Sequence, residues 1–151
     1  MRVVLQRVSS ASVTVDGAVT GVIGAGFYAL VGVGHDATED DARWLAGKTE
    51  ALRVFADERG LMNRSLEEAG GGVLAVSQFT LYADTRRGRR PSFLDAAPPP
   101  LAARLYEAYC DALTVPVGRG VFGAHMVIDA VLDGPVTLLL ERASRVGAGG
   151  A

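Results

Sequence analysis

Two short segments of the chain carry polar or turn-forming residues where the apolar pattern predicts a strand. The first, SQFTL at 77–81, continues the apolar run 73–76, and the second, GPVT at 134–137, interrupts the apolar stretch 126–140. Proline is confined to the edges, first positions and bulges of strands. Because departures from local consistency concentrate at functional sites, the hydroxyls, the amide and the backbone groups of these segments are the main candidates for chemistry.

The motifs of the common hydrolases and nucleotide enzymes are absent from the sequence. There is no Gly-x-Ser-x-Gly elbow, no His-Glu-x-x-His pair, and no P-loop or dinucleotide fingerprint in its strand and helix context.

We expect His35 to be solvated at a strand end and His125 to alternate with buried neighbours, so neither is favoured as a base. The single cysteine, Cys110, excludes an intrachain disulfide and a cysteine zinc site within one subunit, and is expected to be a packed structural thiol. The acidic residues fit solvated helices and turns, so no metal and no cofactor is expected.

The polar residues of SQFTL have both a structural and a functional interpretation. Ser77 and Thr80 could simply bond to neighbouring backbone groups. Gln78 differs, because a half-buried amide needs partners for all its donors and acceptors, and a bound substrate could supply them. Thr80 is the only residue of the segment that could be a covalent nucleophile, yet no base lies beside it in the sequence and an unactivated hydroxyl is inert.

A basic segment, RRGRR at 86–90, stands out because the whole chain has a net charge of -2. Any contact with nucleic acid must therefore come from a local patch. The segment is either a solvated basic loop or a binding site for the phosphates of single-stranded RNA. DNA is not expected as a partner. The nearby Phe93 could offer a stacking face, although core packing is the expectation. The arginines are Arg86, Arg87, Arg89 and Arg90.

These segments, with RRGRRPSF at 86–93 and VFGAHM at 121–126, resemble the D-aminoacyl-tRNA deacylase family, and the resemblance runs from Met1 to about Arg142. It implies a homodimer that hydrolyses the ester between a D-amino acid and the terminal adenosine of tRNA. Backbone N–H groups near Gln78 and Phe79 would stabilise the oxyanion, by about 3 to 4 kcal/mol each. Alternatively, the neighbouring ribose 2′-hydroxyl would assist the reaction, with the protein supplying position and electrostatics. The implied catalytic group is Ser77, Gln78, Phe79 and Thr80.

The resemblance also assigns a role to Gly134 and Pro135, which in isolation would indicate a simple turn between strands. In the family this dipeptide is cis and enters the other subunit's pocket, where its carbonyls face the chiral centre. Such a backbone filter would reject L-aminoacyl esters, accept many D side chains and pass glycine, including glycine mischarged on tRNA(Ala). Arg7 matches a position that braces the dipeptide. The implied pocket wall is Phe122, Gly123, Ala124 and Met126.

The apolar periodicity predicts an α+β fold of mostly antiparallel, barrel-like sheets with roughly eight strands and two helices. Strands fill 2–33, with a two-residue hairpin turn at Asp16-Gly17. One helix spans roughly 39–52 with Thr38 as N-cap, and a second starts at Pro100. A brief strand is expected at 54–55, a polar connection at 63–72 and a central strand at 73–82. After the irregular segment 83–99 and the second helix, further strands are expected at 117–121, 126–132 and 136–142.

Length and composition predict one domain, 1–142, followed by a frayed tail, 143–151. Hydrophobic residues make up 49% of the chain, and no apolar run is long enough to span a membrane or form a signal peptide, so a cytoplasmic protein is expected. Two other functions stay open. One is an RNA-binding module without catalysis, and the other is a hydrolase of free D-amino-acid esters or amides.

Overall fold

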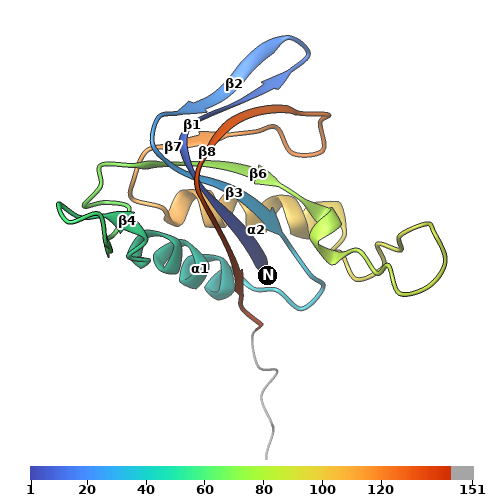
Figure 1. The fold of residues 1–151 in the computed structure, drawn as a ribbon. Helices are drawn as coiled ribbons and strands as arrows, with labels where there is room; N and C mark the ends of the chain where they lie inside the picture. Colours follow the sequence, from blue (N-terminus) through green and yellow to red (C-terminus); the bar gives the residue numbers. More distant parts are fainter. Residues whose placement is uncertain (144–151) are drawn as a thin grey trace, which may run out of the picture.

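The computed structural model describes residues 1–143, and the fold is organised around one long N-terminal strand, β1 (Figure 1). β1 pairs antiparallel with β2, β3 and β8. The turn between β1 and β2 holds Asp16 and Gly17 at φ of 49° and 80°, which confirms the predicted two-residue hairpin. The strands are β1 (Arg2–Val15), β2 (Ala18–Ile23), β3 (Gly26–Gly32), β4 (Phe55–Ala56), β5 (Met62–Arg64), β6 (Gly72–Ser77), β7 (Val117–Arg119) and β8 (Val127–Glu141).

The main sheet is mixed, with strand order β2-β1-β3-β6-β7 and β8 added to β1. β3 pairs parallel with β6, and β6 pairs parallel with β7, so the expectation of mostly antiparallel sheets is wrong for this half. The sheet curls until β2 approaches β7, where the Thr20 hydroxyl donates to the carbonyl of Arg119 over 3.3 Å. The result is a nearly closed, barrel-like sheet, as predicted in outline (Figure 1).

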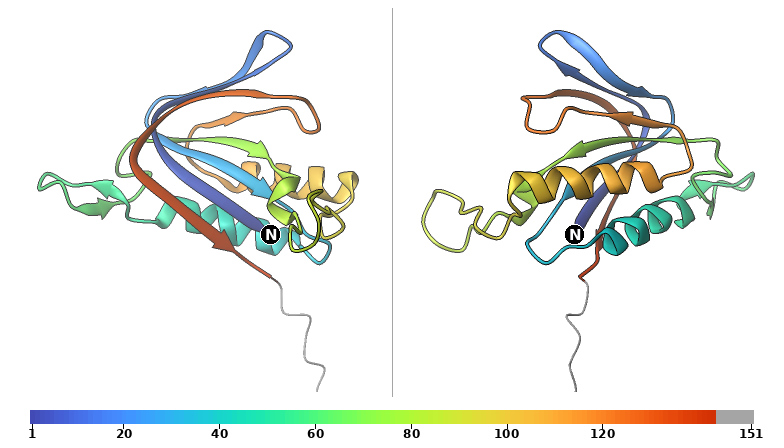
Figure 2. Two further views of the ribbon diagram at one scale, coloured as in Figure 1. Left: turned by 45° about the vertical axis from the view of Figure 1, so that its right-hand side comes forward. Right: turned by 180° about the vertical axis from the view of Figure 1, so that it is seen from behind.

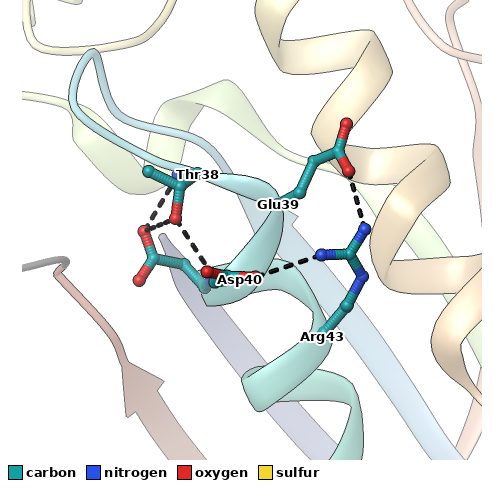
Figure 3. Close-up of polar contacts among 5 residues, drawn as sticks. Thr38, Glu39, Asp40 and Arg43 are labelled. Carbon is teal, nitrogen blue, oxygen red and sulfur yellow. Dashed lines mark hydrogen bonds and ion pairs between the residues drawn. The ribbon is translucent and has the colours of Figure 1, made fainter.

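Two helices, α1 (Glu39–Ala51) and α2 (Pro99–Ala112), lie side by side against the sheet (Figure 2). α1 begins with the predicted N-cap: Thr38 and Asp41 form a reciprocal capping box, and Arg43 pairs with Glu39 and Asp40 on the exposed side (Figure 3). Residues of both helices and of β1, β3 and β6 form one buried core. Cys110 lies in it, which confirms a packed thiol, and burial raises its pKa to about 11. No described helix has the length and apolarity needed to cross a membrane.

The central strand is shorter than predicted. β6 ends at Ser77, and residues Phe79–Tyr82 form a short 3-10 helix, η1, where the apolar pattern predicted strand up to 82. The N–H of Gln78 makes the last bond to β3, donating to the Val31 carbonyl over 2.8 Å. β3 itself stops at Gly32, so within residues 1–143 the chain beyond Gln78 has no neighbouring strand to pair with, and it turns.

The last strand is continuous where two strands were predicted. β8 pairs with β1 on both sides of Gly134-Pro135, and the register jumps between the pair Gln6–Thr137 and the pair Val8–Leu132. The dipeptide therefore sits in a bulge, one of the few places where a strand tolerates a residue without an N–H.

Two smaller differences concern the other predicted strands. β7 ends at Arg119 and not at 121, and the exposed strand β5 replaces the start of the predicted polar connection. β5 pairs with β4 in a small hairpin that projects from the end of α1 (Figures 1 and 2). The predicted tail 143–151 lies, beyond Ala143, outside the described residues.

Candidate active site

A cavity of about 650 Å³ brings together two of the segments singled out in the sequence. Ser77, Gln78 and Phe79 form one side, and residues 122–126 form another. Gly123 has a φ of 77°, which allows the tight turn in which the Ala124 N–H donates to the Val121 carbonyl. The remaining lining is apolar and comes from β3, β6, β8, the segment before α2 and the start of α2, so the cavity suits a partly apolar ligand.

The turn after β6 leaves backbone donors unpaired beside this cavity. The first N–H groups of any helix lack an acceptor within it. Here the N–H groups of Phe79 and Thr80 have no acceptor within residues 1–143. The N–H of Gln78 is bonded to Val31, so of the two donors that the resemblance implied, only that of Phe79 is free.

Thr80 lies outside the cavity lining and is exposed. Its hydroxyl accepts a hydrogen bond from the side-chain amide of Gln78. Among residues 1–143 it has no imidazole or carboxylate as a hydrogen-bond partner, so the structure offers it no activating base. His125 lines the cavity but is exposed, and His35 is bonded to the Leu94 carbonyl over 2.6 Å.

Two aromatic rings lie at the edge of the cavity. Phe79 and Phe93 pack edge to face with ring centroids 4.9 Å apart, and both stay exposed, at 58% and 38%. The expectation of core packing for Phe93 is therefore wrong, because the loop that precedes it brings the ring to the cavity and not to the core. No periodic signal could have placed Phe93, or the α2 residue Ala102, in this lining.

The arginine segment forms a loop that projects away from the sheet beyond η1 (Figure 1). Its base is closed by two backbone hydrogen bonds between Asp84 and Ser92, of 2.7 and 2.9 Å. Arg86 holds Asp84 through two side-chain bonds of 2.8 and 2.7 Å, which keep the pKa of that carboxyl well below its usual range. Arg87, Arg89 and Arg90 are exposed and have no ion pair within the described chain. Three of the four arginines are thus available to a ligand.

Gly134 and Pro135 lie away from the cavity lining of their own chain. Their peptide bond is cis, as the resemblance implied, and both residues are exposed. Arg7 holds the segment: its Nε donates to the Asp133 carbonyl over 3.1 Å, and its Nη1 donates to the Val54 carbonyl over 2.6 Å. The Arg7 side chain is only 14% exposed, so its contacts are largely shielded from solvent.

The strand that carries this dipeptide has an open, apolar edge. Among residues 1–143, β8 is hydrogen-bonded to β1 alone. An unpaired edge of this length is a template for association with another chain. Its exposed apolar residues are Val127, Val131, Leu132 and Leu139.

Among the described residues, no group of three His, Cys, Asp or Glu side chains is arranged to hold a metal ion. The polar groups at the cavity include the unpaired Phe79 N–H, the Ser77 hydroxyl and the Gln78 amide. This set suits the stabilisation of negative charge on a bound substrate.

Comparison with known proteins places these features in a family. The model of the family described as D-Tyr-tRNA(Tyr) deacylase matches residues 4–141. A D-aminoacyl-tRNA deacylase of Roseiflexus castenholzii is 60% identical over 146 residues, covering 95% of this chain and 93% of the relative. A protein of the same name from Opitutus terrae is 56% identical over 149 residues, covering 96% and 99%.

Two solved structures share the fold. The structure titled c-Myc DNA unwinding element binding protein has a TM-score of 0.89 and 36% identity, covering 95% of this chain and all of that one. A probable eukaryotic D-amino acid tRNA deacylase has a TM-score of 0.78, covering 92% and 97%, and at 20% identity it shows likeness of fold alone.

Proposed function

This chain belongs to the D-Tyr-tRNA(Tyr) deacylase family, and we propose that it is a D-aminoacyl-tRNA deacylase, a hydrolase that cleaves the ester between a D-amino acid and the terminal adenosine of tRNA. The observation that carries the proposal is the unpaired N–H of Phe79 at the edge of a cavity of about 650 Å³. Ester cleavage passes through a tetrahedral oxyanion, and a fixed donor in a water-poor site stabilises that charge.

The cavity and the arginine loop bind different parts of the substrate. The aminoacyl group and the terminal adenosine occupy the apolar cavity, with Ser77 and Gln78 as hydrogen-bonding partners. Phe122, Gly123, Ala124 and Met126 form the facing wall. The preceding phosphates of the single-stranded 3′ end reach the arginine loop, which follows η1 directly in the chain. Because charged tRNA is used in translation, we place the protein in the cytoplasm.

The proton chemistry is assigned to the substrate, because Thr80 has no activating base among the residues that the structure describes. The neighbouring ribose 2′-hydroxyl assists the attack, and the protein supplies position and electrostatics. We expect Thr80→Ala to keep most of the wild-type rate on D-tyrosyl-tRNA.

The measurement is single-turnover hydrolysis by Thr80→Ala and by the wild type, each with normal tRNA and with tRNA ending in 2′-deoxyadenosine. The deoxy substrate should be cleaved slowly by both proteins. Normal cleavage of the deoxy substrate by the wild type, combined with an inactive Thr80→Ala, would replace this mechanism with a threonine nucleophile.

Chirality is selected by Gly134 and Pro135 of a second copy of the chain. The support is threefold: the dipeptide is exposed, it does not line its own cavity, and it lies on the open apolar edge of β8. In a two-fold homodimer each interface element recurs on both subunits, so both cavities would be completed. Arg7 fixes the dipeptide through the Asp133 carbonyl.

A filter made of backbone atoms ignores the identity of the side chain and excludes the L arrangement by steric conflict. Glycine has no side chain to exclude and would pass. The same site would therefore also clear glycine mischarged on tRNA(Ala), and hydrolysis of glycyl-tRNA(Ala) by the purified protein tests this part of the proposal.

The arginine loop should act on tRNA through charge. Because Arg86 is occupied by Asp84, we expect Arg87, Arg89 and Arg90 to bind the phosphates. Replacing Arg87 and Arg89 with glutamine should weaken tRNA binding and flatten the dependence of log K on log salt by about 0.7 for each phosphate that is no longer neutralised. Binding measured between low and moderate salt tests this, with Arg59→Gln, an exposed arginine of the β4–β5 turn, as the control. An unchanged slope would make the loop a solvated surface.

Two substrates separate the proposed function from its alternatives. D-tyrosyl-tRNA should be hydrolysed rapidly, and D-tyrosine ethyl ester, which lacks adenosine and phosphates, only slowly. Equal rates would indicate a hydrolase of free D-amino-acid esters, and tRNA binding without hydrolysis would indicate an RNA-binding module.

A further inference from the structure

The short helix η1 carries the unpaired Phe79 N–H. It packs near a row of paired residues on the neighbouring strands β3, β1 and β8. In the register of the sheet Arg2 of β1 lies opposite Gly32 of β3 on one side and opposite Glu141 of β8 on the other. Directly paired residues of antiparallel strands point to the same face of a sheet. Gly32, Arg2 and Glu141 therefore present one continuous surface to η1.

Gly32 makes room for the turn. A Cβ built at Gly32 would lie 3.0 Å from the Leu81 Cβ and 3.1 Å from the carbonyl oxygen of Gln78. Gly34, two residues on, lies equally close to the Tyr82 ring, where a Cβ would lie 2.8 Å from the nearest ring carbon. The Gln78 carbonyl and the Leu81 and Tyr82 side chains thus pack directly against Gly32 and Gly34, and a side chain at Gly32 would push Gln78 and Leu81 away.

Arg2 contacts the C-terminal end of η1. Its Nη1 donates to the Leu81 carbonyl over 2.8 Å, and its guanidinium lies over the Tyr82 ring, 4.6 Å from the centroid. Glu141 holds the guanidinium through an ion pair of 2.7 Å from Nε. The planar fork of arginine satisfies these partners at once, which a lysine could do only in part.

None of Arg2, Gly32 and Glu141 lines the cavity of the active site. Arg2 and Tyr82 belong instead to a separate, more polar cavity. We propose that Arg2 and Gly32 are positioning residues of the deacylase, which fix the Phe79 N–H relative to the bound ester without touching the substrate. This inference rests on the proposed function, because it assigns these residues a part in that reaction.

The kinetic test compares Arg2→Ala and Gly32→Ala with two controls. Arg43→Ala removes an exposed arginine that also bridges carboxylates (Figure 3), and Gly47→Ala adds a Cβ with nothing within 4 Å. A misplacement of about 1 Å at a reacting centre can cost about a hundredfold in rate. We expect kcat on D-tyrosyl-tRNA to fall about tenfold or more in Arg2→Ala and Gly32→Ala, with KM nearly unchanged, and to stay at the wild-type value in both controls.

Arg2→Lys and the melting temperature separate positioning from general stability. The lysine ammonium can still reach the Leu81 carbonyl as a single donor, so Arg2→Lys should be faster than Arg2→Ala. All variants should be folded at the assay temperature. Wild-type kcat in both Arg2→Ala and Gly32→Ala, or losses that follow only the unfolded fraction, would overturn the inference.

Hydrogen exchange tests the same inference without activity. The N–H groups of Leu81 and Ala83 donate to the Gln78 and Thr80 carbonyls, and loosening η1 exposes both. Arg2→Ala should speed exchange in a peptide covering 77–83, whereas Arg43→Ala should not. If the wild type fails to cleave D-aminoacyl-tRNA, the proposed function fails while the exchange result still decides whether Arg2 positions η1. Unchanged exchange in Arg2→Ala would contradict the role of Arg2.

Discussion

Replacing Phe79 with proline is expected to lower the rate of D-tyrosyl-tRNA hydrolysis by about 100- to 1000-fold, the usual cost of losing one oxyanion donor. Proline removes the N–H and nothing else from the backbone. Phe79→Ala is the matched control, since it loses the ring but keeps the N–H, and it should retain far more activity. The comparison is made by single-turnover kinetics with saturating enzyme.

The fold should tolerate this proline. Phe79 is the first residue of η1, where an N–H has no intrahelical partner and where proline is favoured. Gln78, at φ -143° and ψ 85°, lies outside the α region that a following proline disfavours. Equal activity of folded Phe79→Pro and Phe79→Ala would exclude the Phe79 N–H as the oxyanion donor.

Gly134→Val and Phe79→Pro, each inactive as a homodimer, are expected to recover hydrolytic activity when they are combined in a heterodimer. Gly134→Val should block the partner's cavity, because the residue is exposed at the edge of β8, and its φ of 143° is in a region that side chains avoid. In a heterodimer of Gly134→Val with Phe79→Pro, one cavity would combine an intact Phe79 with an intact Gly134. About half of the sites should then be active, as two-fold symmetry requires.

The control for backbone strain is Gly17→Ala, which places a side chain at another positive φ, 80°, with nothing within 4 Å. It should remain active as a homodimer. The measurement uses heterodimers isolated with two different affinity tags and assayed for D-tyrosyl-tRNA hydrolysis. Well-formed heterodimers without activity would rule out a site shared between subunits.

The sequence predicted those elements whose signals are local. The capping box of Thr38 and Asp41 and the hairpin at Asp16-Gly17 depend on residues within a few positions of each other. The SQFTL segment was identified by its departure from the apolar pattern and the VFGAHM segment by resemblance, and the structure places residues 77–79 and 122–126 around one cavity.

The parts that the sequence could not predict depend on distant contacts. β6 ends at Ser77 because β3 ends at Gly32, which the apolar run alone does not reveal. β8 continues past Pro135 because β1 pairs with it on both sides of the bulge. The parallel pairs of β3, β6 and β7 are equally non-local, and so is the packing of Phe93 against Phe79.

The most direct test of the central claim compares D-tyrosyl-tRNA with L-tyrosyl-tRNA in one assay, at equal concentration and with the same tRNA. The two substrates differ only in the configuration at one carbon, so solubility, tRNA binding and ester reactivity are matched. The proposed filter predicts rapid release of D-tyrosine and, for the L substrate, a rate no higher than that without enzyme. Hydrolysis of both at similar rates would contradict the account.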